Sequence, residues 1–175
     1  SSVSSGDASE PISCGVTKPS SPFKSKDELI LAALHRRDEV FRNKMIQYVE
    51  SQPADPVKRL YAIFDWHGQW FNDKHFHGCM FINAAAEFGD PTNPIRRVAA
   101  EHKLSILRYI TERCENANLK RPRELAAHLN LLLEGAIVNA HVVGSSGYEG
   151  AAPVNAAKLA KQAAKILIDA ARKKK

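Results

Sequence analysis

The sequence predicts an all-α protein, and three observations lead to that prediction. Proline stands at the start of several segments in which apolar residues recur periodically, and proline is common in the first turn of helices. Between these points, apolar residues recur at intervals of three, four and seven residues, which places them along one side of a helix. No segment alternates between apolar and polar residues with the period of two that a strand requires.

The first expected helix covers residues 26–51. Ser25 followed three residues later by Glu28 is the pattern of a capping box, and one apolar stripe follows it: Ile30, Leu34, Phe41, Met45 and Tyr48. Asp55-Pro56 combines an N-cap with proline at the first helical position, which predicts a second helix. Its stripe consists of Leu60, Ile63, Phe64, His67 and Phe71. A shorter apolar segment, 79–88, follows.

Three further helices are expected after these. Asn93-Pro94 starts a helix to about residue 117, with the stripe Ile95, Val98, His102, Ile106 and Tyr109. Pro122 starts another, with Leu125, Leu129, Leu132, Ala136 and Val143. Pro153 starts the last, with Leu159, Ala163, Ile166, Leu167 and Ala170.

The last two of these helices have apolar residues beyond a single stripe. Residues 122–143 are apolar on more than one side, and such a helix needs partners on several faces. The final helix is rich in alanine, which lets helix backbones approach closely. We expect the two helices to form half of a four-helix bundle in a two-fold homodimer. A larger core within one chain is the alternative.

Charge and composition exclude several classes of protein. The net charge is +6, from 25 Lys and Arg against 19 Asp and Glu, and residues 151–175 hold 7 basic and 1 acidic of these. The excess is therefore local and does not by itself indicate nucleic-acid binding. The chain has 3 cysteines without paired spacing, which indicates reduced thiols and a cytoplasmic protein. We expect neither a membrane span nor a secretory signal.

Three histidines on separate helices suggest a ligand cavity. His67 and His102 lie on apolar stripes, and His128 lies beside one, with Trp66 and Trp70 in the vicinity. Ligand pockets are mostly apolar with a few polar groups. For each histidine alone, a hydrogen-bonded core residue is the alternative.

The sequence shows no pattern of catalytic residues. His75, His77 and Cys79 are residue types that bind zinc, but their alternation brings them together only in an extended segment. Cys79 opens a short helix, where a thiol that reacts with electrophiles is a second possibility, and a structural buried thiol is the alternative to both. There is no phosphate-binding loop, HExxH motif or nucleophile elbow. We expect no enzyme activity, no cofactor and no metal.

Two stretches resemble the TetR (tetracycline-repressor-like) family of bacterial transcriptional regulators. GVTKPSSPFKSKDELILAALHRR, from Gly15 to Arg37, is similar to the passage from the helix-turn-helix turn through the recognition helix into the connecting helix. The F-x-S-K junction is at residues 23–26. GCMFINAAAEF, EHK and LAAHLNLLLEGAIVNA, within residues 70–140, are similar to the regulatory domain of one branch of the family.

The resemblance implies two domains. Residues 1–25 would be a helix-turn-helix DNA-binding domain, and residues 26–175 a helical ligand-binding and dimerisation domain with 26–51 as its connecting helix. Three helices with turns need on the order of 40 residues, so we expect residues 1–25 to hold only part of the DNA-binding domain. The residues expected at DNA are Thr17, Lys18, Ser20, Ser21 and Lys26.

The resemblance further implies a ligand-responsive regulator, most simply a repressor, that binds a palindromic DNA operator as a homodimer and a small-molecule effector. The expected pocket residues are Phe64, His67, Trp70, Phe81, His102, Ile106, His128, Leu132 and Asn139. The expected dimer residues are Leu133, Ile137, His141, Leu159, Ala163 and Leu167. The alternative function is a stand-alone helical ligand-binding or protein-interaction module without DNA binding.

Overall fold

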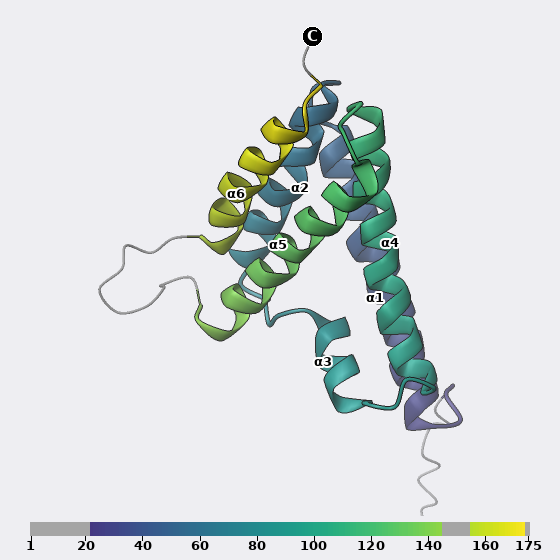
Figure 1. Ribbon diagram of the computed structural model, residues 1–175. Coiled ribbons are helices and arrows are strands. Elements are labelled where there is room, and N and C mark those ends of the chain that lie inside the picture. The colour runs from purple at the N-terminus through teal and green to yellow at the C-terminus, as the bar shows by residue number, and fades with distance from the viewer. Residues whose placement is uncertain (1–21, 145–154, 174–175) are drawn as a thin grey trace, which may run out of the picture.

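The computed structural model describes residues 22–144 and 155–173. Within these ranges the chain forms six α-helices and no strand, which confirms the all-α prediction (Figure 1). The helices are α1 (Lys26–Glu50), α2 (Pro56–Phe71), α3 (Met80–Glu87), α4 (Pro94–Asn116), α5 (Pro122–Val142) and α6 (Ala156–Ala171).

Side-chain caps start the helices where the sequence predicted them. Ser25 Oγ accepts a hydrogen bond from the Glu28 N–H at 3.1 Å, and Glu28 Oε2 accepts one from the Lys24 N–H at 2.7 Å. In this capping box the Glu28 side chain therefore accepts from Lys24, the residue before the N-cap, and not from Ser25 itself. Asp55 caps α2 and Asn93 caps α4, each through its side-chain oxygen. These caps satisfy backbone donors that a helix N-terminus leaves free.

The last helix begins later than predicted. Asn155 is its N-cap, and its side chain accepts hydrogen bonds from the N–H groups of the first turn. Pro153, where we expected the start, lies outside the described residues. The far end of α6 is attached to the start of α5, because the Lys120 N–H donates to the Ala171 carbonyl at 2.8 Å.

The helices pack around α2. This helix contacts α1, α4, α5 and α6, while α1 and α4 run side by side as the two longest helices (Figure 1). The α5 helix packs between α4 and α6, and α3 packs against α4. A continuous hydrophobic core lies between them. The five stripe residues predicted in α2 are all buried.

The stripe predicted in α6 is wrong. Leu159 and Ile166 are 52% and 73% exposed, and the buried side is instead formed by Ala157, Ala160, Ala164 and Ile168. Alanine permits the close approach of α6 to α2: a Cβ added at Gly68 would lie 3.4 Å from the Ala157 Cβ. Three of these four buried residues are alanine, while the larger Leu159 and Ile166 face outward.

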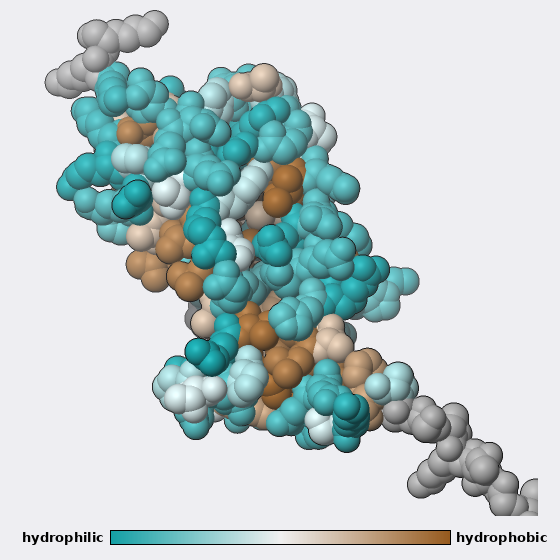
Figure 2. Space-filling model, turned by 90° about the vertical axis from the view of Figure 1, so that its right-hand side faces the viewer, coloured by the Kyte–Doolittle hydropathy of each residue, from teal (hydrophilic) through white to brown (hydrophobic). Residues whose placement is uncertain are grey.

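The apolar character of α5 arises from its position between other helices. By length and mean hydropathy α5 would also suit a membrane span, but its buried side chains belong to the core, among them Leu125, Leu129 and Leu133. Figure 2 shows the side of the molecule on which α4 and α1 lie in Figure 1; it is mostly hydrophilic, with apolar residues in separate patches.

Candidate ligand-binding site

A cluster of aromatic rings joins α1, α2 and α4. Phe41 of α1 is buried at its centre. The Phe41 ring centroid lies 4.7 Å from Trp66 and 4.9 Å from Trp70, and 5.9 Å from His67 and 5.5 Å from His102. All four neighbours meet Phe41 edge to face, a favourable arrangement for aromatic rings. The cluster therefore fixes α1 against the other two helices.

His102 links the cluster to α3 and again to α1. Its ring stacks on Phe81 with centroids 3.7 Å apart and planes 9° apart. Its Nδ1 lies 2.7 Å from Asp38 Oδ1, the geometry of an N–H donating to a carboxylate. Arg42 donates to both Asp38 oxygens, at 2.8 and 2.6 Å. Arg42 and His102 together hold the pKa of Asp38 below its usual value, so Asp38 is a permanent acceptor for His102.

Both buried histidines are neutral at physiological pH. Burial lowers the pKa of His67 to about 4, against a hydrogen bond to the Ile63 carbonyl at 2.8 Å that acts in the other direction. Burial also lowers the pKa of His102 to about 4, although its hydrogen bond to Asp38 opposes this. A neutral imidazole donates one hydrogen bond and accepts another. The site thus presents polar groups without net charge at its core.

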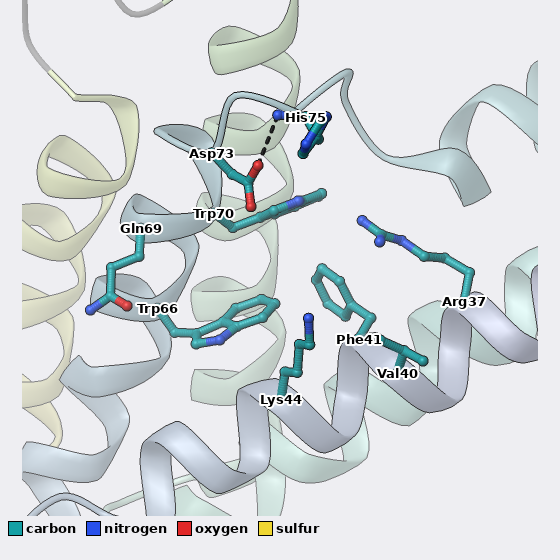
Figure 3. Close-up of a pocket in the computed structure, with 9 residues that line it drawn as sticks. All are labelled: Arg37, Val40, Phe41, Lys44, Trp66, Gln69, Trp70, Asp73 and His75. Atoms are coloured by element: carbon teal, nitrogen blue, oxygen red, sulfur yellow. Dashed lines mark hydrogen bonds between the residues drawn. The ribbon is translucent and has the colours of Figure 1, made fainter.

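An open groove of about 250 Å³ lies between α1 and α2, at the outer side of the cluster. The α1 side is formed by Arg37, Val40, Phe41 and Lys44, and the α2 side and following turn by Trp66, Gln69, Trp70, Asp73 and His75. Figure 3 shows the side chains of Arg37 and Lys44 reaching from α1 toward the rings. The groove therefore combines an aromatic wall with two basic side chains.

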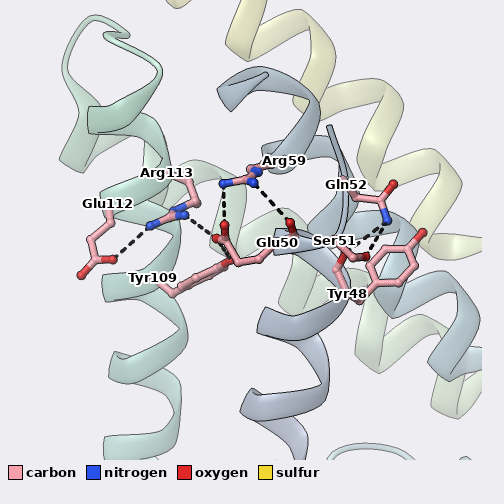
Figure 4. Close-up of polar contacts among 8 residues, drawn as sticks. All are labelled: Tyr48, Glu50, Ser51, Gln52, Arg59, Tyr109, Glu112 and Arg113. Carbon is pink, nitrogen blue, oxygen red and sulfur yellow. Dashed lines mark hydrogen bonds and ion pairs between the residues drawn. The ribbon is translucent and has the colours of Figure 1, made fainter. Parts of the chain in front are cut away.

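The C-terminal end of α1 is anchored by Glu50 (Figure 4). Its carboxylate accepts hydrogen bonds from Arg113 at 2.5 Å and from the Tyr109 hydroxyl at 3.1 Å, and it pairs with Arg59 at 2.5 Å. Arg59 also donates to the Glu50 carbonyl at 3.2 Å. Burial and the neighbouring carboxylate raise the pKa of Tyr109 above its usual value, so it remains a donor. One carboxylate thereby joins α1, α2 and α4.

Comparison with known protein families assigns the chain to one of them. A family model described as the tetracyclin repressor-like C-terminal domain matches residues 56–152, more than half of the chain. The chain belongs to the TetR family of transcriptional regulators. The resemblance of residues 70–140 is thereby confirmed.

The curated relatives that the chain matches are transcriptional regulators of the helix-turn-helix type. The HTH-type transcriptional regulator YjdC of Escherichia coli is 25% identical over 107 residues, which are 61% of this chain and 54% of YjdC. The same regulator of Shigella flexneri matches equally. The chain spans about half the length of these curated relatives.

Two solved structures share the fold of this TetR-family chain. A TetR-family regulator from Streptomyces coelicolor superposes with a TM-score of 0.74 at 24% identity, over 87% of this chain and 76% of that one. A TetR-type regulator from Streptomyces avermitilis gives 0.69 at 27% identity, over 86% and 76%.

The structure places four of the nine predicted pocket residues of this TetR-family chain in the aromatic cluster. His67, Phe81 and His102 belong to the aromatic cluster, and Trp70 lines its groove. Phe64 and Ile106 are buried, and Leu132 is half-buried.

Two predicted pocket residues lie elsewhere. His128 is exposed and lines a separate hollow with Leu167 and the turn before α5. Asn139 is exposed, and its amide donates to the Gly135 carbonyl of its own helix at 2.9 Å. Their spacing on α5 points them away from the cluster. Without these two, the predicted pocket residues belong to α2, α3 and α4, except for the half-buried Leu132 of α5.

Of the residues expected at DNA, only Lys26 falls within the described part of the chain. It is exposed at the first position of α1. Thr17, Lys18, Ser20 and Ser21 lie outside the described residues, as do residues 1–21 of the expected helix-turn-helix domain.

The predicted dimer residues divide between the interior and the surface. Leu133 and Ile137 are buried within the protomer, because this side of α5 packs in the core. His141 and Leu159 are exposed, and Ala163 and Leu167 are half-buried. The apolar residues of α5 that reach solvent are Leu131, Val138 and Val142.

Cys79 and the histidines before it do not converge. Across residues 22–144 and 155–173, no group of three His, Cys, Asp or Glu side chains is placed to hold a metal ion. Cys79 is buried and lies 3.4 Å from Lys103 Nζ, which pairs with Glu134 at 2.6 Å. His75 is exposed and belongs to the groove. The contacts of Lys103 with Cys79 and Glu134 connect the start of α3 with α4 and α5.

Sequence reasoning missed the basic half of the site. Arg37 and Lys44 were not among the expected pocket residues, although they lie seven residues apart on either side of Phe41. That spacing places all three on one face of α1. A search for charged residues flanking a buried aromatic residue of the first helix would have found them.

Proposed function

We propose that the protein is a DNA-binding transcriptional regulator, acting as a repressor, whose helical domain senses a small molecule. The observation that carries this proposal is the match of residues 56–152 to the regulatory domain of the TetR family. Two expected partners follow from it, a palindromic operator and an effector. Such a protein works in the cytoplasm, where its DNA is.

The α1 helix supplies the connection between the two activities. It runs without interruption from Lys26 to Glu50, so a displacement at one end is transmitted along a stiff element. Its N-terminal end follows the segment expected at DNA. Its middle carries Asp38 and Phe41, which contact the aromatic cluster. Movement of α1 against α2 and α4 would alter both the cluster and the position of the DNA-binding segment.

Ligand response requires a difference in affinity between two states. An effector releases DNA only if it binds the conformation that is incompetent for DNA more tightly than the competent one. The groove and cluster are formed jointly by α1 and α2. A ligand between them therefore has an affinity that depends on the position of α1.

The proposed dimer uses the outward apolar faces of α5 and α6. Leu131 and Val142 are 69% and 76% exposed on α5, and Ile166 is the corresponding residue on α6. Exposed apolar patches of this kind mark interaction sites. Two copies of the pair would form a four-helix bundle around a two-fold axis. The proposed interface keeps His141 and Leu159 from the sequence-based prediction. It has the exposed residues of α5 in place of Leu133 and Ile137, which are buried in the protomer.

The test is selection of operator duplexes from random DNA by the full product of the gene, followed by binding titrations against salt. We expect a palindromic site. Lys26→Ala should reduce the slope of log affinity against log salt by about one, because one phosphate contact is lost. Lys58→Ala is the matched control, since Lys58 is also exposed but lies in the first turn of α2, which follows the C-terminal end of α1. Failure to select any sequence would favour the helical module without DNA binding.

A further inference from the structure

We propose that the groove between α1 and α2 binds a planar aromatic anion, such as an aromatic carboxylate. The binding is a property of the groove itself. The consequence for gene regulation rests on the proposed function, because it assumes that α1 positions a DNA-binding segment.

The aromatic wall suits a flat ring. Trp66 and Trp70 lie one turn apart on α2, with centroids 6.2 Å apart and planes 24° apart. Phe41 lies edge-on to both, and Phe76 lies edge-on to Trp70 at 4.9 Å. Both indoles are half-buried, so their rings are held in place yet reach the groove. A flat ring that covers them removes apolar surface from water and makes ring contacts as well.

The charge of the groove favours an anion. Arg37 and Lys44 are its two basic residues, and Asp73 is its one carboxylate. Among the described residues, no carboxylate is within salt-bridge distance of Arg37 or Lys44, whereas the neighbouring Arg36 and Arg42 are paired with Glu39 and Asp38. Asp73 already accepts the His75 N–H at 2.8 Å.

The position of Arg37 connects the wall with the charge. Its guanidinium carbon lies 5.9 Å from the Phe41 ring centroid, so it sits over the ring and directs its donors toward the groove (Figure 3). A guanidinium binds a carboxylate with two parallel hydrogen bonds. A ligand with both an aromatic ring and a carboxylate uses the two features at once. Inorganic phosphate would leave the rings unused, and an aromatic cation would be repelled.

Such a ligand would act on the connecting helix directly. Its anionic group would contact Arg37 and Lys44 on α1, and its ring would contact Trp66 and Trp70 on α2. Any shift of α1 along α2 separates these two sets of contacts. The groove therefore differs from the cavity expected around His67 and His102, where the two imidazoles are buried and uncharged.

The experiment uses the two tryptophans as reporters. Trp66 and Trp70 are the 2 tryptophans of the sequence, so all tryptophan emission of the chain comes from the groove. We choose 4-nitrobenzoate, a planar anion that quenches indole emission on contact, and its neutral isostere 4-nitrobenzamide. Calorimetry gives the Kd, and quenching of the tryptophan emission shows that the ligand binds in the groove. We expect 4-nitrobenzoate to bind about tenfold more tightly than the amide, as a charge-assisted contact allows.

Paired variants test the basic residues. Arg37→Gln/Lys44→Gln should raise the Kd of 4-nitrobenzoate about tenfold and leave that of the amide unchanged. Arg36→Gln/Arg43→Gln removes the same charge from α1 at residues outside the groove lining, and should bind as the wild type. Circular dichroism checks that all variants are folded.

Three results would overturn the proposal: equal affinity for anion and amide, binding without a change in tryptophan emission, or a groove variant that binds like its control. None of them depends on DNA. Operator binding is measured separately, so a failed groove and a failed regulator are distinguishable.

Discussion

The imidazole of His102 is held by partners that lie far from it in the sequence. Asp38 is 64 residues away, and Phe81 belongs to a different helix. The position of His102 on an apolar stripe predicted that it points inward. Its partner could not be predicted, because Asp38 and Arg42 four residues later form a pattern typical of a surface ion pair on a helix.

The two buried histidines should make stability depend on pH. Each has a folded-state pKa of about 4, below the ordinary value of 6.5. Between these values the unfolded chain binds more protons, so the free energy of unfolding falls as pH falls. We expect a loss of about 2 kcal/mol per histidine between pH 7.5 and 5. Urea unfolding at the two pH values measures it.

Variants assign the effect to individual histidines. His67→Gln and His102→Gln should each unfold with a smaller pH dependence than the wild type, since an amide does not titrate. His128→Gln, at an exposed histidine, should retain the full dependence. A wild-type stability that does not change over this pH range would contradict the assignment of both histidines as buried and neutral.

At the scale of elements, the sequence predicted where helices begin better than which way they face. Starts depend on local chemistry, and Ser25, Asp55 and Asn93 cap the helices where expected. The orientation of α6 depends on what packs against it. Its large apolar residues would ordinarily be assigned to the core, but three of its four buried residues are alanine, and at one of them, Ala157, α6 lies close to Gly68 on α2.

The turn before α3 depends on Gly78. Its φ is +81°, and an added Cβ would lie 2.5 Å from Nδ1 of His141 on α5. Gly78→Ala should therefore cost about 1–2 kcal/mol for the left-handed backbone, with a further cost for displacing His141. Chemical denaturation measures the loss.

A double variant separates the two costs. Gly78→Ala/His141→Ala should recover the steric part and retain the backbone part. Gly89→Ala is the control, since a Cβ there meets nothing within 4 Å, and we expect a change within about 0.5 kcal/mol. A Gly78→Ala protein as stable as the wild type would mean that neither the backbone conformation at residue 78 nor its contact with His141 constrains this turn.

For the whole molecule, the sequence predicted the helical class and most of the buried cluster, and it missed the groove. Phe41, His67 and His102 of the cluster lie on apolar stripes, which periodicity identifies. The groove arises only when α1 and α2 are packed, because Arg37 and Lys44 belong to one helix and Trp66 and Trp70 to the other. No pattern within either helix specifies that they meet.

The proposed dimer depends on an apolar residue of α6 that is exposed in the protomer. Ile166 is 73% exposed on α6, which packs against α5, and burying it in a partner would contribute about 1.5–3 kcal/mol. Ile166→Glu places a charge there, so it should convert a dimer into monomers in sedimentation velocity experiments. Leu104→Glu, at a residue 49% exposed on α4, should remain dimeric. A dimer that survives Ile166→Glu would place the two-fold axis elsewhere, and with it the distance between the paired DNA-binding segments that the half-sites of a palindromic operator must match.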